Sequence, residues 1–274
     1  MIKLKPDKDI CVIKAKAGKV PLLILKPVKS ANNAPGILWI HGGGYILGMK
    51  EMVYMGRSAE LVKRYGAVVI SPGYRLAFQA PYPAAIDDCY EALLYLKSHA
   101  IELGVREDQI MVGGESAGGG LCAALCMMAR ERKEVDIAYQ MPLYPMIDNH
   151  DTESSKDNHG KVWNTKRNHF GWRMYLRKDK DSDVSPYAAA ARQKDYSGLP
   201  PAYTFVGDGE PFYSETLKYI EDLNAAGVEA SVDVYHTDTH AFDMLKDNWD
   251  ISKEAVRKFN EHFEYALQNY KTVK

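Results

Sequence analysis

The residues best suited to chemistry lie in a glycine-rich stretch around Ser116. It runs from Gly113 to Gly120 as GGESAGGG, between an apolar segment at 109–112 and an Ala-, Leu- and Met-rich segment at 121–130. Its centre fits G-x-S-x-G, the pattern of a nucleophile elbow, in which a strand turns directly into a helix. Such a turn strains its central residue and leaves no room for side chains two positions away on either side. The pattern therefore predicts that the Ser116 hydroxyl stands at the tip of the turn, at the positive end of the following helix.

A second glycine-rich turn, His41-Gly42-Gly43-Gly44-Tyr45, follows a predicted strand at 36–40. Successive glycines let the backbone approach a bound ester and direct unshielded N–H groups towards it. A dinucleotide site would need G-x-G-x-x-G, but Leu47 stands where its last glycine is required. The turn at Ser116 lacks the Gly-Lys-Ser/Thr ending of a phosphate-binding loop. We therefore predict an oxyanion hole and no cofactor.

A serine hydroxyl is a weak nucleophile until a base removes its proton, and a histidine steadied by a carboxylate suits that task. Two histidines follow the last predicted strand, 230–235. His236 ends the strand itself, whereas His240 lies on the loop beyond it and can swing over Ser116. Their H-x-x-x-H spacing does not indicate a zinc helix, because the threonines between them disfavour helix and no Glu follows His236. We predict His240 as the base.

The sequence offers several carboxylates to partner this base. Asp208 and Glu210 share the turn after a predicted strand at 203–206, and Asp238 and Asp243 flank the base itself. The turn is favoured because it lies at the carboxyl edge of the sheet, where ligands of such sheets bind. The residues alone leave the choice between Asp208 and Glu210 open.

The remaining elements form a regular alternation. Short apolar segments predict strands, and longer amphipathic segments between them predict helices. The predicted strands lie at 10–14, 20–26, 36–40, 67–70, 109–112, 140–145, 203–206 and 230–235, and the helices at 51–65, 84–98, 121–130, 162–177, 214–226 and 251–270. This order predicts an α/β fold, with a mostly parallel central sheet of about eight strands and helices on both faces.

We interpret residues 1–274 as one domain of this kind, with one embedded insertion at 147–200. A polar loop at 149–160 breaks the alternation there, and an aromatic-rich helix at 162–177 follows it. We prefer a small cap over the nucleophile to an ordinary crossover helix. Elsewhere, Arg75 with Asp87 or Asp88 is interpreted as a salt bridge holding a loop against a helix.

Composition restricts the partners. The formal net charge of the 274 residues is −1, which gives no electrostatic case for nucleic acid or a membrane surface. No apolar run approaches the ~20 residues that span a bilayer, and the start lacks the apolar core of a signal peptide. Four scattered cysteines form no disulfide framework, so we expect a cytoplasmic protein. The glycine-rich turns at 42–44 and 114–118 indicate a small-molecule ester substrate. We allow for a homodimer, which no segment specifies.

No metal is predicted, since the spacing of His150, Asp151, His159 and His169 matches no ligand pattern.

Four motifs occur in an order that resembles the hormone-sensitive-lipase-like esterases, a family of α/β-hydrolases. They are HGGGY at 41–45, YRLA at 74–77, GESAGG at 114–119 and HAF at 240–242, and the likeness runs from about residue 36 to 245. The resemblance implies a serine carboxylesterase in which Ser116 attacks and His240 transfers the proton. It also implies oxyanion donors at the amides of Gly43, Gly44 and Ala117.

The resemblance also bears on the acid. The family has Asp-Pro-Leu/Phe-x-Asp-Glu after Leu-Pro-Pro, and here LPP at 199–201 precedes EPFYSE at 210–215. Glu210 is therefore the expected acid, with Asp208 as second choice. Glu115 stands where the family usually has Asp, a change expected to be structural. A small cap suggests an open site for short, acetyl-like acyl chains. The alternatives are an aryl-formamide or small-amide hydrolase and a non-catalytic binding protein on a hydrolase scaffold.

Overall fold

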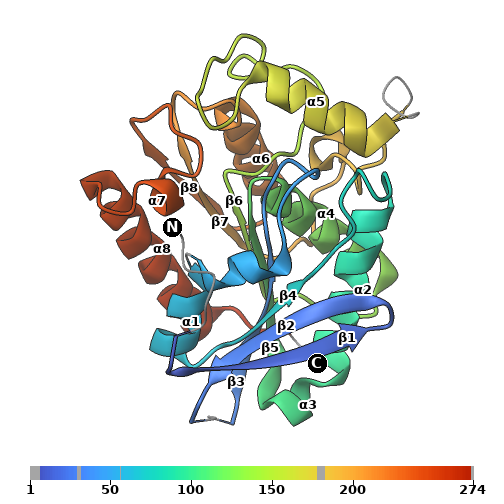
Figure 1. Cartoon of the computed structure of the whole chain (residues 1–274), viewed down its shortest axis with the longest axis vertical. Coiled ribbons are helices and arrows are strands. Elements are labelled where there is room, and N and C mark those ends of the chain that lie inside the picture. Colours follow the sequence, from blue (N-terminus) through green and yellow to red (C-terminus); the bar gives the residue numbers. More distant parts are fainter. Residues whose placement is uncertain (1–6, 30–31, 56, 178–182, 273–274) are drawn as a thin grey trace.

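The computed structural model describes residues 7–29, 32–55, 57–177 and 183–272 and contains one eight-stranded sheet (Figure 1). The strands occur in the order β1-β2-β4-β3-β5-β6-β7-β8. Their bounds are β1 Ile10–Ala17, β2 Val20–Pro27, β3 Ala34–Ile40, β4 Val68–Pro72, β5 Val105–Glu115, β6 Tyr139–Leu143, β7 Ala202–Gly207 and β8 Ala230–Tyr235. The first two strands pair antiparallel, and every pairing from β4 to β8 is parallel. The predicted α/β class with a mostly parallel sheet is confirmed.

Helices cover both faces of this sheet. They are η1 Lys50–Tyr54, α1 Arg57–Tyr65, α2 Ala84–Ser98, α3 Ala100–Leu103, α4 Ala117–Arg132, α5 Thr165–Leu176, η3 Ala190–Arg192, α6 Tyr213–Ala225, α7 Phe242–Leu245 and α8 Asp250–Asn269. On one face β3 packs Leu38 and Ile40 into the core shared with α2 and α4. On the other face Ile37 and Trp39 pack into the core shared with α1 and α8. This alternation follows from the two-residue period of a strand that is buried on both sides.

Three predicted helices differ from the structure by more than one residue at an end. The helix expected at 51–65 is interrupted: η1 ends at Tyr54 and α1 begins at Arg57, while Gly56 lies outside the described residues. The helix after the nucleophile begins directly at Ala117 rather than at 121. Glycine occurs inside its first turn because this turn packs closely against β3 and leaves no room for a Cβ atom on Gly118. The helix expected at 162–177 begins at Thr165, after Asn164 accepts a hydrogen bond from the Arg167 amide.

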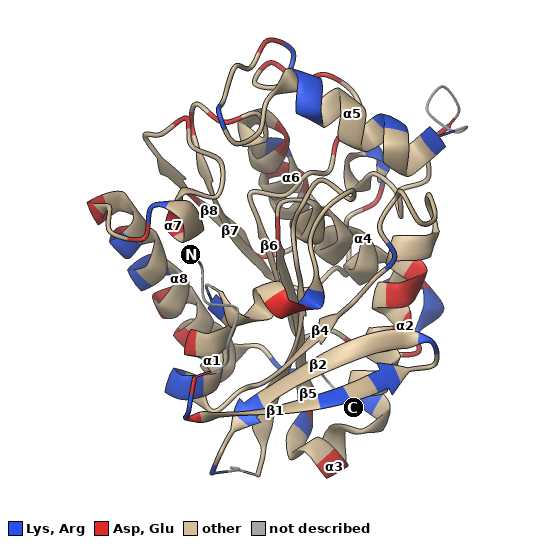
Figure 2. Cartoon of the chain, in the orientation of Figure 1, with Lys and Arg blue, Asp and Glu red and all other residues tan. Residues whose placement is uncertain are grey.

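Charged residues lie mainly on the helices, the loops and the edge strand β1, and the inner strands carry few (Figure 2). The predicted salt bridge between the loop and the helix is confirmed, with Asp88 as the partner of Arg75: Arg75 Nη2 lies 2.7 Å from Asp88 Oδ1.

Within the described part of the chain, none of the helices has the length and apolar character needed to cross a membrane.

Candidate active site

The turn between β5 and α4 has the strained geometry that the sequence predicts. Ser116 has φ 58° and ψ −118°, a backbone conformation that residues other than glycine rarely adopt. A Cβ atom on Gly114 would lie 2.6 Å from the carbonyl oxygen of Gly118, and one on Gly118 would lie 2.1 Å from that of Ile40. Both flanking positions therefore require glycine. The turn is held from below by a hydrogen bond from the Ser116 amide to the carbonyl of Leu143 on β6, 3.0 Å long.

Ser116, His240 and Glu210 meet at the carboxyl edge of the sheet. His240 Nε2 lies 2.9 Å from Ser116 Oγ, and Nδ1 of the same ring is hydrogen-bonded to Glu210 Oε2. The side chains arrive from three places: the elbow, the loop after β8 and the turn after β7. Glu210 is fully buried, and its other oxygen accepts a hydrogen bond from the Gly207 amide at 3.1 Å. With both oxygens engaged, this carboxylate fixes which ring nitrogen of His240 faces the serine.

Aromatic rings enclose the imidazole of His240. Tyr144 and Phe212 meet it edge to face, with ring centroids 5.1 Å and 5.0 Å away. The next residue, Ala241, has φ 55°, so the loop turns sharply directly after the histidine. These contacts leave the ring one orientation, and its two nitrogens point to Ser116 and Glu210.

The competing histidine and acid form a separate pair at the surface. His236 Nδ1 lies 2.8 Å from Asp208 Oδ2, and Asp208 Oδ1 also accepts from the Thr237 amide at 3.1 Å. The side chain of His236 is 97% exposed. Asp208 raises the pKa of His236 through this hydrogen bond and its charge. Of the flanking acids, Asp238 is exposed and Asp243 is buried against Arg57. None of these groups contacts Ser116.

The predicted oxyanion loop, residues 42–44, lies beside the elbow. Its glycines carry no side chains that would cover the backbone. Gly43 has φ 118° and Gly44 has φ 60°. Neither amide donates to an acceptor within the described ranges. Ala117 is the first residue of α4, where an N–H has no partner inside the helix. Gly43, Gly44 and Ser116 line one cavity, so the loop and the hydroxyl face the same space.

His41 fixes the start of this loop. Its Nδ1 lies 2.8 Å from the carbonyl oxygen of Gly42, and its ring stacks on Tyr74 with centroids 4.3 Å apart. The Tyr74 hydroxyl donates to the carbonyl of His41 at 2.9 Å. Burial lowers the pKa of His41 to about 4, so the ring is neutral at pH 7 and its Nδ1–H donates to Gly42.

The cavity in front of Ser116 has a volume of about 180 Å³ and is lined almost wholly by apolar groups. Its walls come from η1, from the segment before α5 and from the histidine loop. The lining residues are Gly42, Gly43, Gly44, Met52, Met55, Glu115, Ser116, Tyr144, Val162, Trp163, His240, Ala241, Met244 and Leu245. Sequence reasoning missed the methionine wall. The spacing of Met52 and Met55 also fits the buried side of a helix, and no local pattern separates a core position from a cavity wall.

Glu115 is a further carboxyl group beside the nucleophile. Burial raises its pKa to about 8, and nearby Asp243 acts in the same direction. Trp39 Nε1 donates to Glu115 Oε1 at 2.7 Å, and this contact opposes the shift, as does Arg57. The carboxyl is therefore mostly protonated at pH 7 and places little charge near the site. Within the described ranges, no three His, Cys, Asp or Glu side chains are arranged to hold a metal ion.

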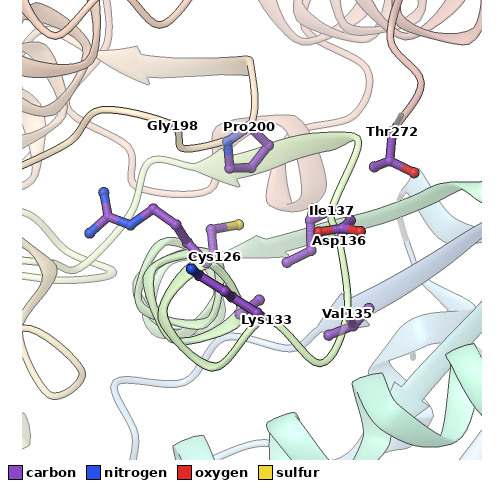
Figure 3. A pocket seen from close by; sticks show the side chains of 10 residues that line it. Cys126, Lys133, Val135, Asp136, Ile137, Gly198, Pro200 and Thr272 are labelled. Carbon is purple, nitrogen blue, oxygen red and sulfur yellow. The ribbon is translucent and has the colours of Figure 1, made fainter. Parts of the chain in front are cut away.

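A larger cavity, about 470 Å³, lies at the opposite end of α4 (Figure 3). Arg130, Lys133 and Asp136 line it together with Cys126. Cys126, the lining residue of α4 nearest the elbow, follows Ala117 by nine residues, which places it about 14 Å along the helix axis. It contains no serine or histidine, so its size does not make it the better candidate.

Known proteins resemble this chain over most of its length. The profile of a family described as alpha/beta hydrolase fold matches residues 37–244. An arylesterase from Saccharolobus solfataricus is 31% identical over 233 residues, which cover 84% of this chain and 75% of that protein. Carboxylesterase NlhH from Mycobacterium tuberculosis is 30% identical over 227 residues, which cover 81% and 71%. The solved structure of a bacterial heroin esterase has a TM-score of 0.87 at 31% identity, covering 92% of this chain and 82% of that one.

Proposed function

Since the chain belongs to the hormone-sensitive-lipase-like family of α/β-hydrolases and is a carboxylic ester hydrolase, we propose that it cleaves short-chain acyl esters through Ser116, His240 and Glu210. One observation carries the assignment: a single imidazole lies 2.9 Å from the hydroxyl at the elbow and is hydrogen-bonded to a buried carboxylate on its other side. This is the arrangement in which a serine becomes a nucleophile at neutral pH.

In the first half-reaction the Ser116 oxygen attacks the ester carbonyl carbon while His240 Nε2 takes the hydroxyl proton. The carbonyl oxygen becomes an oxyanion, and the carboxylate of Glu210 steadies the imidazolium. When the tetrahedral intermediate collapses, the bond to the alcohol oxygen breaks and Nε2–H protonates that oxygen. In the second half-reaction a water molecule gives a proton to His240 Nε2 and attacks the acyl carbonyl carbon. The bond between that carbon and Ser116 Oγ then breaks, Nε2–H returns the proton to Oγ, and the acid leaves.

We assign the oxyanion to the amides of Gly43, Gly44 and Ala117. Gly43 and Gly44 line the same cavity as Ser116, and their amides have no other acceptor among the described residues. Ala117 directly follows Ser116 as the first residue of α4. The N-terminus of α4 adds the positive end of its dipole at the same point. Removing one donor of such a site typically costs on the order of 100- to 1,000-fold in turnover.

The cavity suggests the size and polarity of the acyl group. A protein cavity of roughly 150 Å³ accommodates a benzene ring, so about 180 Å³ suits a butyryl-sized group better than a long chain. Its walls offer almost no hydrogen-bonding groups, which favours an uncharged, unsubstituted acyl chain.

We further propose that the insertion at 147–200 acts as a small cap. Helix α5 lies above the carboxyl edge of the sheet (Figure 1), and Val162 and Trp163 form part of the cavity wall. The Trp163 ring fills the space beside Gly44, where a Cβ atom would lie 2.1 Å from it. Residues 178–182 of the proposed cap lie outside the described residues.

Hydrolysis of p-nitrophenyl acetate, butyrate and decanoate tests these assignments together. The butyrate and acetate should be cleaved faster than the decanoate, and Ser116→Ala should abolish turnover while the unfolding midpoint stays unchanged. Trp163→Ala should raise the rate of decanoate hydrolysis relative to that of butyrate, because removal of the ring lengthens the cavity. Absence of hydrolysis with all three esters would favour a binding protein, and faster cleavage of a formyl-arylamide would favour an amide hydrolase.

We also propose a cytoplasmic location, because all four cysteines of the chain are unpaired, three of them buried. Cell fractionation tests this location. A homodimer remains part of the proposal, and light scattering on the purified protein tests it.

A further inference from the structure

A buried ion pair lies behind the proposed active site and takes no part in the chemistry described above. Arg57 Nη2 is 2.8 Å from Asp243 Oδ2, and the two side chains are 3% and 1% exposed. The partners are 186 residues apart in the sequence. Asp243 follows His240 by three residues, so the pair links the first turn of α1 to the segment that carries the proposed base.

The guanidinium end of this link is fixed in the core. The Arg57 Cζ atom lies 5.5 Å from the ring centre of Phe205 on β7 and 5.1 Å from that of Phe259 on α8. A planar guanidinium resting on aromatic faces is held in one orientation, and its N–H groups then point in a defined direction. Arg57 therefore offers the histidine segment a fixed point of attachment.

The segment between His240 and Asp243 needs such an attachment. Ala241 has φ 55°, in the left-handed region that a residue with a Cβ atom rarely adopts. A strained backbone of this kind persists only where the surrounding structure holds it. On one side of the strained residue, His240 is held by its contacts to Ser116 and Glu210. On the other side, Phe242 is fully buried and Asp243 is bonded to Arg57.

Stability alone does not explain the pair. Removing two charges from water costs free energy that their attraction offsets only in part, so apolar residues of similar volume commonly stabilise a fold as well or better. Here Arg57 Nε and Asp243 Oδ1 also have no hydrogen-bond partner among the described residues. An ion pair fixes the relative orientation of its two side chains, because its hydrogen bond forms in one geometry only. An apolar pair imposes no such orientation.

We propose that Arg57 and Asp243 are positioning residues, which hold the segment after β8 so that His240 stays within hydrogen-bonding distance of Ser116. The inference rests on the proposed function, since it assigns the pair a task in the same reaction. Loosening the segment should lower kcat by a larger factor than it raises KM, because the proton transfer loses its geometry. Ala241, Met244 and Leu245 belong to both the segment and the cavity wall, whereas the walls from η1 and from the residues before α5 stay in place.

The test replaces the pair with apolar residues in the full chain. Arg57→Met combined with Asp243→Leu removes both charges together, so no unpaired charge remains buried. We expect kcat for p-nitrophenyl butyrate to fall roughly 10- to 100-fold, the range that a misplacement of about 1 Å can cost. Reaction of Ser116 with a fluorophosphonate should slow in parallel. Asp243→Asn keeps the shape of the side chain and an acceptor oxygen for Arg57, so its kcat should fall less than that of the double variant.

A second ion pair on the same helix supplies the control. Arg64 of α1 lies 2.8 Å from Glu264 of α8, with side chains 52% and 44% exposed and no link to the histidine segment. Arg64→Met combined with Glu264→Leu should leave kcat unchanged. Comparison of urea midpoints identifies the folded variants. Unchanged kcat in every folded variant of Arg57 and Asp243 would overturn the inference, while wild-type hydrolysis and labelling of Ser116 test the proposed function independently.

Discussion

Two histidine–carboxylate pairs bridge the same two loops, and their surroundings differ completely. His240 and Glu210 are 5% and 0% exposed, whereas His236 and Asp208 are 97% and 37% exposed. Both pairs join the turn after β7 to the loop after β8, and both involve the Nδ1 atom of the imidazole. Only the buried pair has a hydroxyl within reach of its other nitrogen.

The difference shows that burial, rather than the pair itself, distinguishes the candidate site. A carboxylate shielded from water interacts strongly with an imidazole, whereas at the surface solvent and salt screen the same charges. The buried pair is also held by Tyr144 and Phe212, which stop the ring from turning. The exposed pair is fixed on the acid side only, by the Thr237 amide.

The largest predicted effect separates the two histidines. His240→Ala should lower kcat on the order of 10⁶-fold, as loss of the base does in serine hydrolases, because no group remains to accept the proton of Ser116. His236→Ala should leave kcat close to the wild-type value. Steady-state hydrolysis of p-nitrophenyl butyrate measures both. Comparable losses in the two variants would contradict the assignment of His240 as the base.

Substitution of the two acids should produce a smaller difference in kcat than substitution of the two histidines. Glu210→Gln preserves the shape of the side chain but no longer fixes the tautomer of His240, and kcat should fall on the order of 10⁴-fold. Asp208→Asn should alter only the surface pair and keep nearly full turnover. The same ester assay decides between them, and a large loss in Asp208→Asn with a small one in Glu210→Gln would reverse the assignment.

Glu115 extends the comparison, because it is buried like Glu210 but has no histidine partner among the described residues. Its pKa, raised by burial to about 8, means that raising the pH places a negative charge directly beside Ser116, where the oxyanion forms. The negative charge of Asp243 acts in the same direction on the pKa of Glu115, and the positive charge of Arg57 offsets it only in part. We expect kcat to decline above about pH 8, and Glu115→Gln should shift or remove this decline. An identical alkaline limb in wild type and variant would show that another group causes it.

The same group predicts the direction of a stability change. Because the pKa of Glu115 is raised from 4.5 to about 8 in the folded state, the folded protein binds more protons than the unfolded chain between these values. Its contribution to stability is complete below pH 4.5 and decreases as the pH rises to 8, by at most about 1.4 kcal/mol per pH unit. Urea unfolding at pH 5 and pH 8 should show a smaller decrease for Glu115→Gln than for the wild type.

The smallest predicted effect concerns the exposed pair. The pKa of His236 is raised by its hydrogen bond to Asp208, and this rise should largely disappear in Asp208→Asn. It should also shrink between 0.1 M and 1 M salt, because exposed charges are screened. An NMR titration of the histidine ring protons measures both changes. A shift that salt leaves untouched would show that the pair is more shielded than its exposure indicates.

Much of the fold follows from patterns within a few residues. The alternation of apolar strands and amphipathic helices predicts the α/β class, and the structure has the eight-stranded sheet expected. The helix at 84–98 has the predicted bounds. The interruption near Gly56 was not predicted, because the period of Met52, Met55 and Ala59 continues across it. Such a period records which side chains are apolar, and it does not record whether the backbone between them stays helical.

Local sequence was enough to predict the strained turn at Ser116 and the unshielded glycine backbone at 43–44, because steric rules between neighbouring residues allow little else. It also brought both motifs to one edge of the sheet, since the carboxyl ends of parallel strands lie together. Local patterns also placed His240 on a loop that can reach Ser116, but they left Asp208 and Glu210 as alternative acids. Tertiary packing sets the Glu210 carboxylate against His240, lines the cavity with methionines and joins Arg57 to Asp243. Those contacts join residues separated by up to 186 positions, and burial, which selects among chemically similar side chains, exists only once the distant segments have packed.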